Sequence, residues 1–111
     1  MKTRIKATNT ELTSYLEKLI EEKLSEIEKG LKGIPDLLAE IEVGLTSRHH
    51  QKGDIYRAEL QIQVPGKLLR AVSEKEDFRS ALTDAKNEIK LQIKQYKDKA
   101  VSRKRRIVKE K

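Results

Sequence analysis

Basic side chains gather near the end of the sequence, in a pattern suited to binding a polyanion. From Lys86 to Lys111 there are eleven lysines and arginines and three acids, whereas the preceding residues carry fourteen basic and fifteen acidic groups. The formal net charge of +7 therefore comes entirely from this end of the chain. Such a concentration of one sign of charge is typical of proteins that bind phosphate-rich partners.

Within this stretch, four lysines recur every three or four residues, which places them on one face of a helix. No acid in the sequence pattern is placed to neutralise this row, and it continues into a block of arginines. Lysines on a terminal helix also commonly serve solubility, but here they hold nearly all the unbalanced charge, which favours polyanion binding. The candidate contacts are Lys86, Lys90, Lys94, Lys97, Lys99, Arg103, Lys104, Arg105 and Arg106.

Residue types that could carry out catalysis or bind a metal are few. There is no cysteine, and the only histidine pair, His49-His50, lies in a polar loop with Asp54 as its one nearby acid. No metalloprotease, phosphate-binding-loop or serine-hydrolase motif is present. We therefore expect no enzymatic activity, catalytic residue, metal, cofactor or small-molecule substrate. For this loop a solvated or RNA-contacting role is favoured over a metal site.

The hydrophobic pattern predicts one α+β domain with the order β-α-β-β-β-α. Alternating apolar and polar residues predict strands near residues 2–7, 37–45, 56–64 and 67–73. Helical periodicity predicts helices from Ser14 to Gly30, capped by Thr13, and from Glu76 or Asp77 to about Lys99. Each strand has a single apolar face, so both helices should cover one side of a four-stranded mixed sheet.

The last predicted strand permits two registers. Leu69, Ala71 and Ser73 face the core in the first, which we favour, and Leu68 and Val72 do so in the second. The first strand should bury Thr3, Ile5 and Ala7. After Ala100 the apolar pattern stops, so residues 1–100 are assigned to a single domain and 101–111 to a basic, flexible tail.

The choice of polyanion depends on what the basic helix leaves exposed. A membrane surface would require large apolar residues opposite the lysines, but the apolar stripe must cover the sheet, leaving Leu91 as the main spare residue. No apolar run is long enough to span a membrane, and no signal peptide is evident, so we expect a cytoplasmic protein. No base-reading motif is evident either. The expected partner is structured RNA, contacted through its phosphates and shape.

Two stretches of sequence, together with the order of elements, resemble the ribosome hibernation promoting factors, also known as ribosome-associated inhibitors or sigma-54 modulation proteins. The first stretch is IKATNTELT, from Ile5 to Thr13. The second comprises Ala81, Leu82, Ala85, Ile89, Gln92, Ile93, Tyr96, Lys97 and Lys99. The resemblance covers residues 1 to about 100. It is to the short form, which lacks the extra C-terminal dimerisation domain.

This resemblance implies a stress or stationary-phase factor that binds the small ribosomal subunit between its head and body. There it would overlap the sites of messenger RNA and of the A-site and P-site transfer RNAs, block translation and preserve idle ribosomes. In that family, basic residues of the second helix contact 16S ribosomal RNA, which matches Lys94, Lys97 and Lys99. Relatives often carry basic residues at positions held here by Glu88, Leu91 and Gln95.

The sequence thus predicts a factor that is monomeric when free and binds the small ribosomal subunit and its 16S ribosomal RNA. Other hibernation factors are further candidate partners. A general double-stranded or structured-RNA-binding module and a regulator that binds a protein remain as alternatives. Second-tier RNA contacts are expected at Arg4, Lys6, Arg48, His49 and Lys52.

Overall fold

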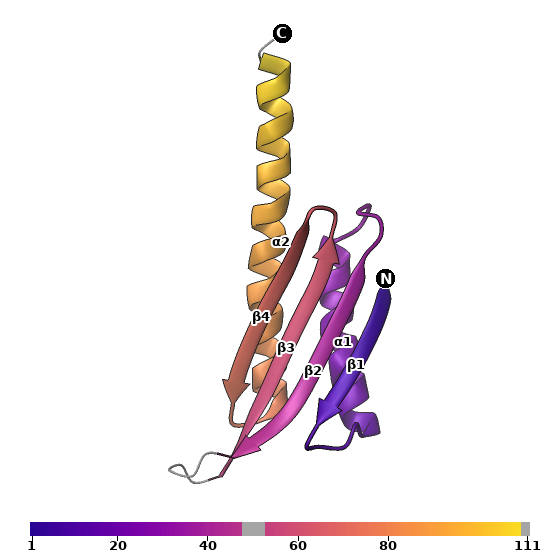
Figure 1. Cartoon of the computed structure of the whole chain (residues 1–111), viewed down its shortest axis with the longest axis vertical. Helices are drawn as coiled ribbons and strands as arrows, with labels where there is room; N and C mark the ends of the chain where they lie inside the picture. The colour runs from indigo at the N-terminus through magenta and orange to yellow at the C-terminus, as the bar shows by residue number, and fades with distance from the viewer. Residues whose placement is uncertain (48–52, 110–111) are drawn as a thin grey trace.

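The structure, a computed structural model, describes residues 1–47 and 53–109 (Figure 1). The elements in chain order are β1 (Lys2–Thr8), α1 (Ser14–Gly30), β2 (Leu38–Ser47), β3 (Asp54–Val64), β4 (Lys67–Lys75) and α2 (Phe78–Lys109). The strands form a mixed sheet in the order β1-β2-β3-β4, in which β1 is parallel to β2 and the other pairs are antiparallel. The predicted order β-α-β-β-β-α is confirmed.

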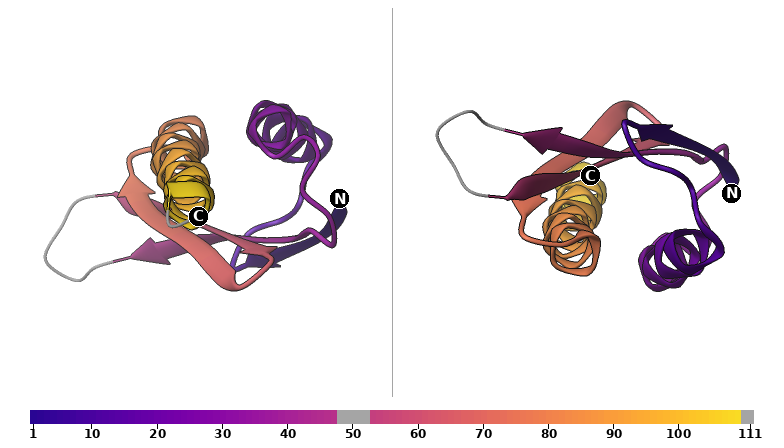
Figure 2. Two further views of the ribbon diagram at one scale, coloured as in Figure 1. Left: turned by 90° about the horizontal axis from the view of Figure 1, so that it is seen from above. Right: turned by 90° about the horizontal axis from the view of Figure 1, so that it is seen from below.

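Both helices lie on the same side of the sheet, as the two end-on views show (Figure 2). The core between the helices and the sheet is aliphatic. Each strand turns alternate residues toward the helices, and each helix contributes one stripe of apolar residues. A fully buried leucine or isoleucine stabilises the fold by about 1.5–3 kcal/mol, so this layer fixes both helices on the sheet. Its members include Leu16, Leu19, Ile20, Ile27, Ala39, Ile41, Val43, Ala58, Leu60, Ile62, Leu69, Leu82, Ala85 and Ile89.

The structure bears out both the predicted start of α1 and the favoured register of β4. Thr13 Oγ1 accepts a hydrogen bond from the backbone N–H of Leu16 at 3.2 Å, which confirms the predicted cap. On β4, Leu69, Ala71 and Ser73 are buried, whereas Leu68 and Val72 are 48% and 43% exposed, so the favoured register is confirmed. Ser73 is tolerated in the core because its hydroxyl donates to Asp84 Oδ2 at 2.8 Å.

Coverage of β1 is weaker than the sequence pattern predicts. Ile5 and Ala7 are only half-buried and Thr3 is exposed, so the expectation that Thr3 is buried is wrong, although it lies on the helix side of the sheet as the alternation predicts. The reason is position: β1 is an edge strand with one neighbour, and Thr3 lines an open groove between β1 and α1.

The second helix begins as expected but continues further. Asp77 accepts from the backbone N–H of Ser80 at 2.7 Å, which makes Asp77 the cap in preference to Glu76. The helix does not end near Lys99: residues 100–109 contain neither glycine nor proline, and α2 extends to Lys109. Its last part projects beyond the sheet (Figure 1), in a molecule with extents of 61 × 29 × 18 Å. Independent motion of residues 101–111 stays a prediction.

The β3–β4 turn helps to place the outer part of α2. Gly66 has a φ of +78°, the positive value that the Pro65-Gly66 pair predicts. Tyr96 of α2 donates a hydrogen bond to the carbonyl oxygen of Pro65 at 2.8 Å. Over the described ranges, no helix is both long and apolar enough to cross a membrane.

Candidate nucleic-acid interface

The α2 lysine row, which consists of Lys86, Lys90, Lys94 and Lys97, begins on the side of α2 that faces α1. Lys86 Nζ lies 3.2 Å from Glu26 Oε2 of α1, and the Lys86 side chain is only 12% exposed. The expectation that no acid would neutralise this row is therefore wrong at Lys86. Periodicity within one helix cannot reveal this partner, because Glu26 comes from a helix that is 60 residues away in the sequence.

Glu26 lies close to several basic side chains. Lys86, whose Nζ lies 3.2 Å away, contributes most to holding the pKa of Glu26 below its usual value; burial opposes this effect, and the charges of Lys23 and Lys90 add to it. The carboxylate therefore stays ionised at neutral pH. Lys86 links the two helices and contributes little free positive charge to the surface.

The other three lysines of the row remain available to bind an anion. Lys90, Lys94 and Lys97 are exposed, and none of them forms an ion pair with another described residue. The two helices run in the same direction (Figure 1), and α1 ends at Gly30, where an added Cβ would lie 3.7 Å from Ile93 of α2. Lys94 and Lys97 thus come at and beyond the end of α1, past the reach of its facing acids.

The remaining predicted contacts of α2 are placed differently. Lys99 is exposed, but it follows Lys97 by two residues and so lies roughly 200° around the helix axis, away from the row. The backbone of Arg103, Lys104, Arg105 and Arg106 belongs to the part of α2 that projects beyond the sheet. Arg48, His49 and Lys52 lie outside the described residues.

The open face of the sheet carries both signs of charge. Arg4 and Lys6 are exposed on β1, and in the parallel register they pair with Glu40 and Glu42 of β2. Neighbouring opposite charges of this kind largely cancel at a distance, because water and salt screen what remains. The sheet face is therefore a poorer polyanion site than α2, and Arg4 and Lys6 remain second-tier candidates.

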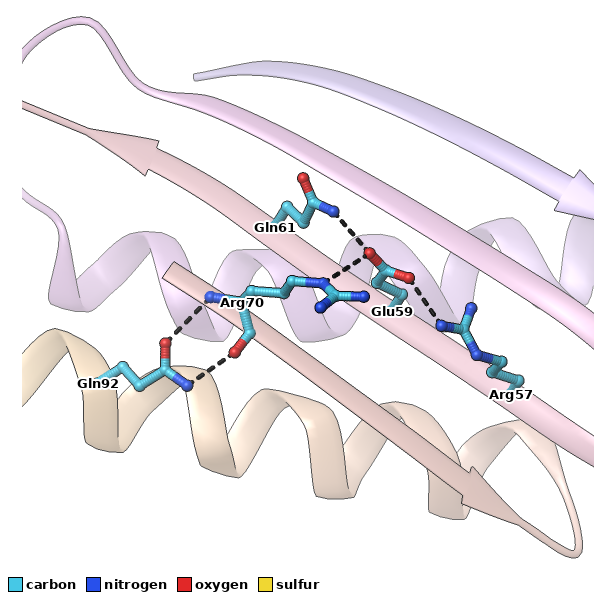
Figure 3. Close-up of polar contacts among 5 residues, drawn as sticks. All are labelled: Arg57, Glu59, Gln61, Arg70 and Gln92. Carbon is cyan, nitrogen blue, oxygen red and sulfur yellow. Dashed lines mark hydrogen bonds and ion pairs between the residues drawn. The ribbon is translucent and has the colours of Figure 1, made fainter. Parts of the chain in front are cut away.

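Further along this face, two arginines are held by a single carboxylate (Figure 3). Arg57 Nη2 donates to Glu59 Oε1 at 2.9 Å, and Arg70 Nε donates to Glu59 Oε2 at 3.0 Å. Gln61 donates to the same Oε2 at 2.6 Å. The hydrogen bond from Arg70 contributes most to lowering the pKa of Glu59 to about 2, with Gln61 and Arg57 adding to it against an opposing effect of burial.

The same cluster ties the edge strand to the basic helix. Gln92 of α2 accepts a hydrogen bond from the backbone N–H of Arg70 at 3.0 Å and donates one to its carbonyl oxygen at 2.8 Å (Figure 3). These bonds satisfy backbone groups that an edge strand would otherwise leave open. Gln92 therefore fixes α2 along β4 and helps to hold the lysine row in a defined orientation.

Replacing Glu59→Gln should lower the stability of the fold at pH 7 by about 1 kcal/mol, since Arg70 is 54% exposed and solvent weakens the pair. The folded pKa of about 2 lies below the ordinary 4.5, so this contribution is complete above about pH 4.5 and is lost as the pH falls toward 2. Urea unfolding of the parent and the variant at pH 7 and at pH 2.5 measures this.

The difference in unfolding free energy between parent and variant should shrink at the acid pH. The control is Glu40→Gln, which removes the same charge from β2 and leaves the hydrogen bonds of the Glu59 cluster intact. An equal loss for Glu59→Gln at both pH values would contradict the assigned role of the carboxylate.

Other basic residues belong near the outer part of α2, although the sequence pattern did not single them out. The connection after α1 and the β3–β4 turn lie at the end of the sheet from which α2 projects (Figure 1). These segments carry exposed Lys32, in the connection, and exposed Lys67, directly after the turn. The predicted topology could have found them, because in a β-α-β-β-β-α sheet the two segments must lie at the same end.

A mixed four-stranded sheet with both helices on one face, and a basic helix that projects beyond it, defines an α+β domain with a basic helical extension. The chain belongs to the sigma 54 modulation protein / S30EA ribosomal protein family, whose profile matches residues 3–101. It is thus a member of a ribosome-associated family. This confirms the relationship that residues 5–13 and 81–99 indicate.

Two solved structures show the same fold. The N-terminal domain of Protein Y from Thermus thermophilus has a TM-score of 0.71 and 25% sequence identity, with 86% of this chain and 99% of that chain covered. A ribosomal subunit interface protein from Coxiella burnetii has a TM-score of 0.72 at 18% identity, with 88% of this chain and 99% of that chain covered. No curated protein matches the chain.

Proposed function

We propose that this protein is a non-enzymatic hibernation factor that binds the small ribosomal subunit in its decoding channel. There it would exclude messenger RNA and transfer RNA, inhibit translation and preserve idle ribosomes. Family membership supports the ribosome as the partner. The observation that carries the mode of binding is the set of exposed lysines Lys90, Lys94 and Lys97, which have no ion-pair partner among the described residues and lie on a helix packed into the core.

The shape of α2 suits phosphate contacts at fixed positions. Lys90 and Lys97 are separated by roughly 10 Å along the helix axis, so the row can meet more than one phosphate of a folded RNA. The helix is held by buried Leu82, Ala85 and Ile89, so few of its contacts require ordering on binding. The projecting part, with Arg103 to Arg106, would extend the contact with 16S ribosomal RNA beyond the sheet.

This proposal assigns a cytoplasmic, ribosome-bound state to the protein and a monomeric state to its free form. Lys99 serves as a separate contact on another side of α2, and Lys32 and Lys67 join the surface from neighbouring segments. Lys86 contributes to the site by linking α2 to α1 through its ion pair with Glu26. Other hibernation factors would act on the same ribosomes.

A general duplex-binding module is the main competing function, because a row of lysines attracts the phosphates of any helix. The proposal predicts at least tenfold tighter binding to isolated small subunits than to a naked 20-base-pair RNA duplex at the same salt, together with inhibition of a cell-free translation extract. Equal affinity for the small subunit and for the duplex, without inhibition of translation, would favour the duplex-binding module. A complex that survives nuclease and high salt would instead indicate a protein partner.

A further inference from the structure

Building on the proposed function, we infer that Glu26 of α1 limits where RNA phosphates can bind along α2. It forms an ion pair with Lys86, and it thereby confines the phosphate-binding surface to the part of the row from Lys90 outward. Glu26 is thus a specificity-determining residue that acts by repulsion, although it belongs to a helix with no predicted RNA contact.

The ion pair places a negative charge where a phosphate would have to approach. The Glu26 side chain is 39% exposed and the Lys86 side chain is 12% exposed, so Glu26 is the more accessible member of the pair, while its Oε2, the oxygen nearest to Lys86, is buried against it. A phosphate that approached Lys86 from solvent would therefore come against the negatively charged Glu26 side chain first. The site is closed by like charge, which discriminates against a ligand more sharply than the mere absence of an attraction.

Nearer the N-terminus of α2, groups on α1 also block the approach of phosphates to the side of α2 that carries Lys86. Arg79 lies two turns before Lys86, and its guanidinium donates to the hydroxyl of Tyr15 on α1 at 3.2 Å. The charge of Glu22 on α1 also acts on Arg79. The groups on α1 therefore face the inner part of this side of α2, from Arg79 to Lys86, whereas Lys94 and Lys97 lie at and past the end of α1.

This arrangement separates two kinds of RNA ligand. A long duplex lying along the whole of α2 would bring phosphates against Glu22 and Glu26, and the repulsion would offset part of the gain from the lysines. A folded RNA that receives only the outer part of α2 avoids both carboxylates. The acids of α1 therefore favour end-on insertion of the helix over side-by-side binding to generic duplexes.

The test compares Glu26→Gln with Glu28→Gln. Both remove one negative charge from α1, but Glu28 lines the groove on the β1 side of the helix. Binding to a naked 20-base-pair RNA duplex is measured over a salt series. For Glu26→Gln we expect about fivefold tighter binding at low salt and a salt slope steeper by up to about 0.9, the value for one added phosphate contact. Glu28→Gln should stay within about twofold of the parent.

A parallel measurement with small subunits separates this inference from the proposed function. If Lys97→Ala weakens subunit binding while Glu26→Gln and Glu28→Gln bind the duplex alike, the inference about Glu26 is wrong and the proposed function stands. If Lys97→Ala leaves subunit binding unchanged, the proposed function fails. Should Glu26→Gln prove unstable, Glu22→Gln tests the same repulsion: it removes the partner of Lys23 at 3.7 Å and leaves the Glu26–Lys86 pair intact. Unchanged duplex binding in that variant would overturn the inference.

Discussion

Replacing Lys94 and Lys97 together by alanine should weaken binding to the small ribosomal subunit by about fiftyfold at 0.1 M salt. Each lysine that neutralises a phosphate releases condensed counterions, so losing two contacts should flatten the slope of log K against log salt by about 1.4–1.8. Both side chains are exposed on the outer part of α2, and no described acid pairs with them. Co-sedimentation of the variant with small subunits over a salt series measures both quantities.

The matched control replaces two exposed lysines elsewhere, Lys18 of α1 and Lys75 of β4, by alanine. This variant has the same net charge as the Lys94/Lys97 variant, so it separates local contact from general electrostatic attraction. Both variants should change the free energy of unfolding by less than about 0.5 kcal/mol per site, as exposed substitutions usually do. If the two variants lose subunit binding equally, the α2 lysine row is not the RNA-binding surface.

Much of the fold could be predicted because its signals are local. Alternation alone identified the buried faces of β2 and β3, and the hydroxyl of Thr13 marked the first turn of α1. The Pro65-Gly66 turn fixed where β3 ends and β4 begins. These features depend on a few neighbouring residues, so the sequence contains them directly.

The predictions that failed depend on neighbours that are distant in the sequence or on a missing stop signal. Thr3 is exposed because β1 lies at the edge of the sheet, a position that its own alternation does not encode. Lys86 is neutralised by Glu26, which a helical wheel of α2 alone cannot include. The end of the apolar stripe near Lys99 marks where α2 leaves the sheet, and the helix itself continues to Lys109.

The location of the candidate site could be predicted from the sequence, but which basic residues belong to it could be predicted only in part. Period and charge pointed to α2, and Lys90, Lys94 and Lys97 are exposed as expected. Which basic residues remain free depends on where α1 ends relative to α2, and this follows only from the packing of Gly30 beside Ile93. The structure therefore shifts the proposed surface outward along the helix, toward Lys32 and Lys67.

The proposal that the protein occupies the decoding channel has an all-or-none consequence. A protein of this size that fills the sites of messenger RNA and transfer RNA cannot share them, so small subunits already loaded with both should lose nearly all binding. Equally, an excess of the protein should prevent loading of empty subunits.

The sedimentation profile of the unaltered protein with empty and with loaded small subunits tests this most directly. The proposed function predicts that the protein sediments with empty subunits and stays at the top of the gradient with loaded ones, with at least a tenfold difference in bound fraction at limiting protein. A subunit loaded with messenger RNA alone should also lose binding, because the proposed site overlaps the messenger RNA. Equal co-sedimentation with empty and fully loaded subunits would contradict binding in the decoding channel.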